Sequence, residues 1–137
     1  MTVESTPGPP LYARAGGMPF FERLVDRFYA GVESDPVLLA VYPDHADFAG
    51  ARHRLTLFLA QYWGGPTTYS DERGHPRLRA RHFPFAIGPA ARDRWLAHMR
   101  AAIDESGAPD DVRGELHDYM TMAAEAMRNR EDDASTG

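Results

Sequence analysis

Hydrophobic residues recur along this chain with the spacing of amphipathic helices, and no segment shows the alternation that is typical of a strand. The spacing predicts a short helix over residues 11–15 and a short one over 36–42. It predicts four longer helices, over 19–34, 47–63, 89–106 and 110–130. Prolines open several of these segments, and glycines or Gly-Pro pairs close them. Four helices with one apolar stripe each are expected to pack their stripes together, so the fold class is all-α.

The connection from Gly64 to Gly88 is long for a compact domain. We expect residues 67–74 to be irregular, and a helix of about two turns between Pro76 and His82. The four arginines, two histidines and several aromatic residues of this connection argue against disorder and indicate that a ligand lies beside it. The alternative is a surface helix whose histidine is merely solvated.

Composition narrows the chemistry further. The chain of 137 residues suits one domain, which we place at 11–130 between disordered segments 1–10 and 131–137. It has no cysteine and no lysine, which excludes disulfides, thiolate chemistry, iron–sulfur clusters and Schiff bases. The net charge of −5 argues against nucleic-acid binding. Without a membrane-length apolar run or a signal peptide, we expect a cytoplasmic protein with no stable membrane insertion.

None of the common metal or hydrolase motifs accounts for the six histidines. The one Glu-x-x-His spacing, Glu72 to His75, lies in a glycine-containing loop, and Pro76 separates His75 from His82. A single histidine beside an apolar cavity is what a haem needs, because imidazole is a standard axial ligand of its iron. The nearby arginines supply positive charge for haem propionates; these candidates are Arg77, Arg79 and Arg81.

A linked series of motifs makes this interpretation more specific. The series runs in order through Gly16-Gly17, Arg27-Phe28-Tyr29, Val41-Tyr42-Pro43, Gln61-Tyr-Trp-Gly-Gly-Pro66, Tyr69-Ser70, Arg73-Gly-His-Pro-Arg-Leu-Arg79, Arg81-His82-Phe-Pro-Phe85 and Arg92-Asp-Arg-Trp95. From about Leu11 to Arg130 the chain thereby resembles the group II truncated haemoglobins. One departure is Ala80, which stands where family members usually have methionine.

The resemblance implies a truncated globin fold, a two-over-two helical sandwich around haem b. It implies that His82 is the proximal ligand of a pentacoordinate iron, and that Tyr29, Tyr42 and Trp95 form the distal ligand-binding site. It places Ala51, Leu55, Phe58, Leu59 and Phe85 in the haem pocket, and adds Tyr69 to the propionate candidates. Without the resemblance, Tyr29 and Trp95 would be interpreted as core aromatics, Tyr42 as a loop anchor and the arginines as a solvated rim.

The expected function is reversible binding of diatomic gases, namely O2, CO and NO. Two classes of function stay open. One is a redox enzyme, such as a nitric oxide dioxygenase or a weak peroxidase, which needs an external reductase because no flavin or nicotinamide domain is evident. The other is a non-enzymatic oxygen binder, scavenger or gas-sensing module. The sequence also leaves the oligomeric state open, a homodimer included.

Overall fold

The computed structural model describes residues 9–42, 47–75, 77 and 87–128, and within these it contains helices and no strand. The helices are α1 (Leu11–Ala15), α2 (Met18–Val32), α3 (Pro36–Leu39), α4 (Phe48–Tyr62), α5 (Thr68–Arg73), α7 (Pro89–Asp104) and α8 (Asp110–Met127). The all-α prediction is therefore confirmed, and each helix predicted over the described residues is present.

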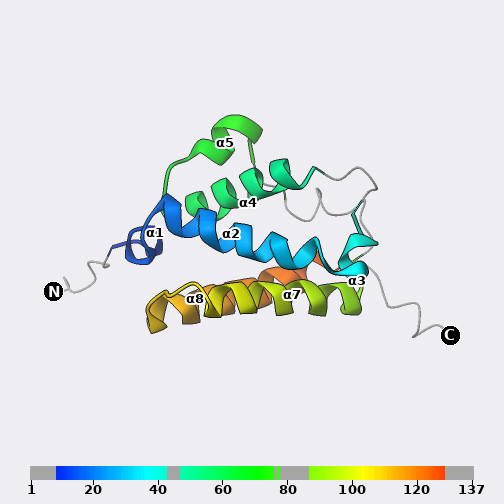
Figure 1. Cartoon of the computed structure of the whole chain (residues 1–137). Coiled ribbons are helices and arrows are strands. Elements are labelled where there is room, and N and C mark those ends of the chain that lie inside the picture. The colour runs from blue at the N-terminus through cyan, green and yellow to red at the C-terminus, as the bar shows by residue number, and fades with distance from the viewer. Residues whose placement is uncertain (1–8, 43–46, 76, 78–86, 129–137) are drawn as a thin grey trace.

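Two pairs of long helices form two layers (Figure 1). Helix α2 packs on α4 in the upper layer of that view and on α7 below, and α7 in turn packs on α8. The short α3 follows α2 and packs on α7, while α5 lies against α4. This is the two-over-two arrangement that we expected from the sequence.

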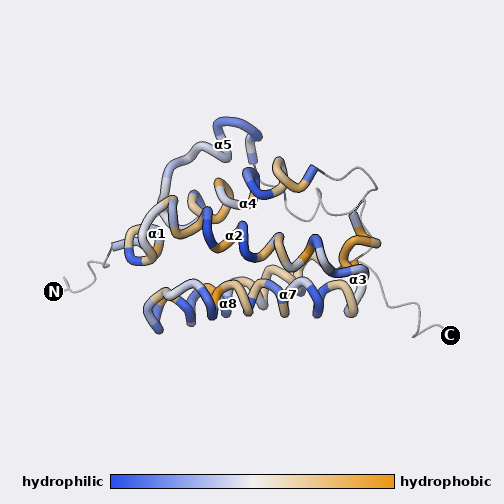
Figure 2. Tube along the Cα trace, viewed as in Figure 1, coloured by the Kyte–Doolittle hydropathy of each residue, from blue (hydrophilic) through white to orange (hydrophobic). Residues whose placement is uncertain are grey.

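Helix α2 is the centre of the core, because it contacts both layers. Its fully buried side chains include Phe21, Phe28 and Val32, and they meet Met99, Ile103, Val112, Leu116 and Met120 from α7 and α8. Figure 2 shows hydrophobic and hydrophilic residues alternating along these helices, as expected when one side of each faces a core. Burying a side chain of this size stabilises the fold by roughly 1.5–3 kcal/mol.

Two aspartates and a glycine fix helix ends in this fold. Asp35 caps α3 by accepting a hydrogen bond from the Val37 amide (3.0 Å), and Asp47 caps α4 by accepting one from the Gly50 amide (2.8 Å). Gly16 (φ 119°) ends α1 in a left-handed conformation that other residues rarely adopt. Together these ends determine where the chain turns between the layers.

One expectation about the upper layer was wrong. The segment 67–74, expected to be irregular, contains α5, because the Gln61 side chain holds Ser70 twice: it accepts from the Ser70 amide (2.9 Å) and donates to its hydroxyl (2.7 Å). The helix expected between Pro76 and His82 lies outside the described residues. Within the part that the structure describes, no helix is long and apolar enough to cross a membrane.

Candidate functional site

A cavity of about 540 Å³ lies between the two layers. Its walls come from α2, α3, α4 and α5 on one side and from α7 and α8 on the other. Most of the lining is apolar, and it includes Leu38, Val41, Phe48, Leu59, Ile87, Ala91, Met120, Ala123 and Met127. The size and apolar lining are those of a small-molecule or cofactor site.

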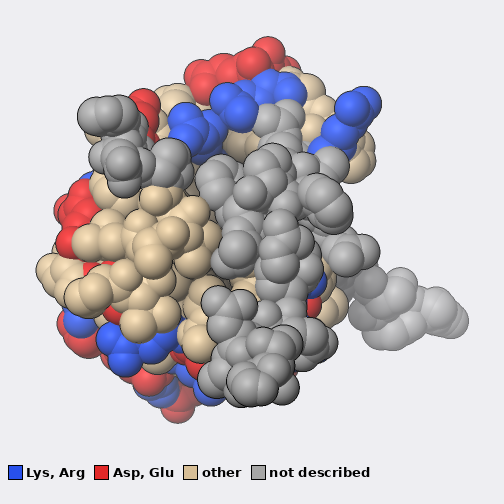
Figure 3. All heavy atoms as spheres, turned by 90° about the vertical axis from the view of Figure 1, so that its right-hand side faces the viewer, with Lys and Arg blue, Asp and Glu red and all other residues tan. Residues whose placement is uncertain are grey.

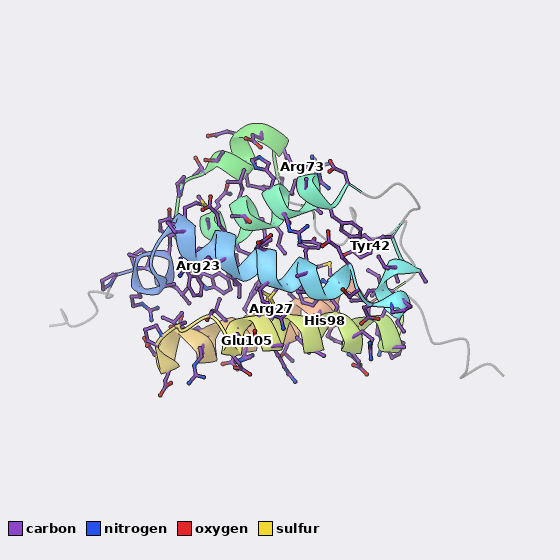
Figure 4. All side chains as sticks on the ribbon, in the orientation of Figure 1. Arg23, Arg27, Tyr42, Arg73, His98 and Glu105 are labelled. Atoms are coloured by element: carbon purple, nitrogen blue, oxygen red, sulfur yellow. The ribbon has the colours of Figure 1, made fainter. Side chains whose placement is uncertain are left out.

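Among the lining side chains that have hydrogen-bond donors, two tyrosines and one tryptophan come from three different segments. Tyr29 lies on α2, Tyr42 follows α3, and Trp95 lies on α7. We call these three residues the distal cluster. The sequence analysis assigned the same three residues to ligand binding, and the fold brings them to one cavity (Figure 4 labels Tyr42).

Two phenylalanines link the members of the distal cluster. Phe28, which is fully buried, makes edge-on contacts with both the Tyr29 ring (4.9 Å between centroids) and the Trp95 ring (5.0 Å). Phe48 lies between the Tyr29 ring (6.0 Å) and the Tyr42 ring (5.2 Å). Because each ring is packed against the next, the three donors are held in a fixed frame.

Burial keeps the two phenols of the cluster protonated. It is the main cause that raises the pKa of Tyr29, and the neighbouring Tyr42 hydroxyl raises that pKa further. Burial likewise raises the pKa of Tyr42. The Arg52 guanidinium lies 5.7 Å from the Tyr29 ring centroid, on its face, and ion pairs to Asp26 and Glu33 hold it there. Both phenols therefore keep their protons over the whole physiological pH range.

Helix α4 supplies a continuous wall. Ala51, Leu55, Phe58 and Leu59 all line the cavity, in the positions that the sequence analysis gave to the pocket wall. Tyr69 of α5 also lines it, is buried, and packs its ring edge-on against Phe58 (5.6 Å). Ala51 is small and has no polar side-chain atom, so it can add no hydrogen bond to a ligand.

Positive charge reaches the cavity from residues that the sequence analysis did not select. Arg54, Arg73 and Arg92 are among the lining residues; Figure 4 shows Arg73 between α4 and α5. Helical spacing could have found two of them, since Arg54 is three residues after Ala51 and Arg92 three before Trp95. Of the earlier propionate candidates, Arg77 is exposed and Arg79 and Arg81 lie outside the described residues, as do His82 and Phe85.

These described residues fit a haem. Its macrocycle is flat and apolar, which suits the α4 and α8 walls, and its two carboxylates suit a border that carries Arg54, Arg73 and Arg92. Among the described residues, no group of three or more His, Asp or Glu side chains is arranged to hold a bare metal ion.

Three of the described histidines pair with carboxylates. His53 contacts Glu72 (3.1 Å) in an exposed position, and His117, whose side chain is 27% exposed, contacts the exposed Asp104 (2.8 Å). His98 differs, because its partner is the buried Asp35 (2.7 Å). The sequence analysis missed this pair, whose members are 63 residues apart and share no local pattern.

Comparison with known proteins agrees with the cavity and the fold. Residues 10–129 match the family model of the bacterial-like globins. The Group 2 truncated hemoglobin YjbI of Bacillus subtilis is 39% identical over 114 residues, which are 83% of this chain and 85% of that protein. The hemoglobin of Chloroflexus aurantiacus is 51% identical with a TM-score of 0.86, covering 90% of this chain and all of that one. The group II truncated hemoglobin of Bacillus anthracis is 36% identical with a TM-score of 0.85, covering 91% and 100%. The chain is therefore a member of the bacterial-like globin family, and its fold is the truncated two-over-two globin fold.

Proposed function

We propose that this globin binds haem b in the cavity, with His82 as the proximal ligand, and that it reversibly takes up O2, CO or NO. The observation that carries the proposal is the distal cluster, which puts two phenols and one indole on the lining of an otherwise largely apolar cavity. His82 lies outside the described residues, so its role rests on the sequence motif around it.

A haem held in this cavity would supply an iron that can bind a diatomic ligand. The chain's own residues decide how such a ligand is held. The apolar wall of Leu55 and Phe58 excludes water, which strengthens every hydrogen bond made inside the cavity. The phenols and the indole then donate to a ligand that carries partial negative charge, and they slow its release.

The arginines of the cavity border are the candidates for holding the propionates. Arg54 and Arg92 lie on opposite layers, on α4 and α7. Arg92 is itself paired with Asp93 and Glu125, which fixes its direction. Tyr69, Arg77, Arg79 and Arg81 remain candidates from the sequence.

Three donors around one ligand favour chemistry on the ligand over rapid transport. A fitting reaction is the oxidation of nitric oxide, in which NO, O2 and one electron give nitrate, the electron coming from an external reductase. A peroxidase activity would use the same donors. The alternative is a binder or sensor without turnover. Very slow oxygen release would argue against transport, and rapid consumption of nitric oxide by the oxygen-bound protein, with turnover supported by a reductase, would argue for the enzyme.

The first experiment is the visible absorption spectrum of the purified protein, ferric, reduced, and then under CO and O2. We expect a Soret band that shifts with each ligand. His82→Ala should lose stoichiometric haem, whereas the matched control His75→Ala, an exposed histidine seven residues earlier, should keep it. Full haem retention with unchanged spectra in His82→Ala, or no Soret band after hemin is added to the parent, would overturn the proposal.

A further inference from the structure

Asp35 is a buried carboxylate that does not itself line the cavity. Only 2% of the residue is exposed, and its carboxylate accepts three hydrogen bonds. One oxygen accepts from the Val37 amide (3.0 Å); the other accepts from Arg94 Nε (2.8 Å) and His98 Nε2 (2.7 Å). A carboxylate in this position needs such partners, because burying an unpaired charge is very unfavourable. The Arg94 and His98 hydrogen bonds lower the pKa of Asp35 to about 2, so it is ionised and His98 Nε2 must be the donor.

The partners of Asp35 connect it to the segments that carry the distal cluster. Asp35 itself begins α3, the helix that leads to Tyr42. Arg94 and His98 are four residues apart, so they share one face of α7. Trp95 follows Arg94 directly and lies on the adjacent face, toward the cavity. One carboxylate thus holds α7 at the turn that presents the indole.

The His98 ring is also confined on its other side. A Cβ atom at Gly31 of α2 would lie 2.5 Å from His98 Nδ1, so the ring occupies space that any larger residue would fill. Figure 4 shows His98 at the contact between α7 and α2, near the α3 end. Its side chain is 25% exposed. The ring is therefore clamped between the α2 backbone and the Asp35 carboxylate, and it cannot shift without moving α7.

We propose that Asp35 is a positioning residue for the distal cluster, which acts through Arg94 and His98 to set where the Trp95 indole stands in the cavity. The effect on a diatomic ligand rests on the proposed function. The position of the Trp95 indole is a property of the protein alone, so that part of the proposal is independent of the proposed function. The contrary interpretation is that Asp35 only stabilises the α3 corner.

The first test monitors the environment of the Trp95 indole directly, through its chemical shift in 19F NMR of the full chain labelled with 5-fluorotryptophan. The chain has two tryptophans, and Trp95→Phe assigns the signals. We expect Asp35→Asn and His98→Gln each to move or broaden the Trp95 resonance and to leave that of Trp63 in place. The matched control is His117→Gln, which removes a similar histidine–aspartate contact (2.8 Å to Asp104) on the surface and should move neither signal. An unmoved Trp95 signal in both folded variants would overturn the proposal, whether or not the protein binds haem.

The second test uses the haem-loaded protein and a double-mutant cycle. Asp35→Asn should speed oxygen release roughly threefold to tenfold, less than Trp95→Phe does, and should shift the infrared C–O stretch of the carbon monoxide form. In the Trp95→Phe background the same Asp35→Asn change should have little further effect on the release rate. An undiminished effect in that background would show that Asp35 does not act through the indole, and would overturn the proposal. If the parent protein does not bind haem, that result would instead contradict the proposed function.

Discussion

The molecule contains two clusters of one tryptophan and two tyrosines, and they differ in how their rings pack. All three members of the distal cluster, Tyr29, Tyr42 and Trp95, line the cavity. The second, which we call the α4-end cluster, consists of Tyr62, Trp63 and Tyr119, and of these only Tyr119 lines the cavity. Its rings pack directly on each other, with centroids 4.3 Å apart for Tyr62–Tyr119 and 5.0 Å apart for Tyr62–Trp63 and Trp63–Tyr119.

The surroundings explain the difference. In the distal cluster, phenylalanines pack between the rings, and the buried Asp35 accepts hydrogen bonds from the helix that carries the indole. In the α4-end cluster the rings cover one another, and the Trp63 carbonyl accepts a hydrogen bond from the Tyr12 amide (3.0 Å), which ties α1 to the end of α4. Under the proposed function, the same residue types would serve a ligand in one place and packing in the other.

Figure 3 shows the face of the molecule at the α3 end, with arginine and acidic side chains together over the upper layer beside an uncharged area. The exposed Val37 and Leu39 of α3 belong to that side. Substitutions can test the difference between the two clusters.

The largest effect is expected from the phenylalanines that support each cluster. Phe28→Ala and Phe21→Ala each remove a fully buried ring, and each should lower the free energy of unfolding by roughly 3–5 kcal/mol. Phe28 contacts Tyr29 and Trp95, whereas Phe21 stacks on Trp63 (6.3 Å between centroids). Urea unfolding measures the stability of both variants.

Ligand binding should separate these two variants. At a temperature where both stay folded, only Phe28→Ala should change the oxygen release rate, because only Phe28 supports the distal donors. Equal changes in release rate would mean that both clusters influence the ligand, and the comparison would fail.

The tryptophans provide the next comparison. Trp95→Phe removes a donor from the dry cavity and should speed oxygen release roughly 10- to 100-fold, as expected for a hydrogen bond worth about 1.5–3 kcal/mol to a charged partner. Trp63→Phe, the matched control, should leave the release rate unchanged and lower only stability. Stopped-flow measurement of the oxygen release rate tests this prediction. An unchanged rate in Trp95→Phe would mean that Trp95 only packs in the core.

The sequence predicted the helices well because their apolar stripes are long and regular. Helix α5 was missed because its six residues carry no such period; Gln61, on another helix, holds it in place. The wall residues Leu55 and Phe58 could be placed from helical spacing. Asp35 could be recognised only as the cap of α3. Its bonds to α7 depend on how two distant segments pack, which no local pattern encodes.

The acid stability of the fold should depend on Asp35. Because the folded-state pKa, about 2, lies below the ordinary value of 3.8, the ionised group stabilises the fold above about pH 4. That contribution is lost as the pH falls from about 4 to about 2. Unfolding midpoints in urea, measured from pH 7 to pH 2, should therefore fall less steeply across this window in Asp35→Asn. Over that window, the variant should release up to about one proton less on folding. Identical slopes in parent and variant would contradict the assignment.

The smallest effect concerns the α4-end cluster at high pH. Burial, and to a smaller extent the neighbouring Tyr62, raise the pKa of Tyr119 to about 12 from an ordinary value of 10. The neutral phenol therefore stabilises the fold fully below about pH 10, and this contribution is lost as the pH rises toward 12. Phenolate absorbance, compared between the parent and Tyr119→Phe, isolates this one titration. Tyr62→Phe should lower the Tyr119 pKa only part of the way toward 10, since burial is the larger cause. A fall all the way to 10 would mean that Tyr62, and not the packed environment, controls the group, and the α4-end cluster would then be an electrostatic pair rather than a packing unit.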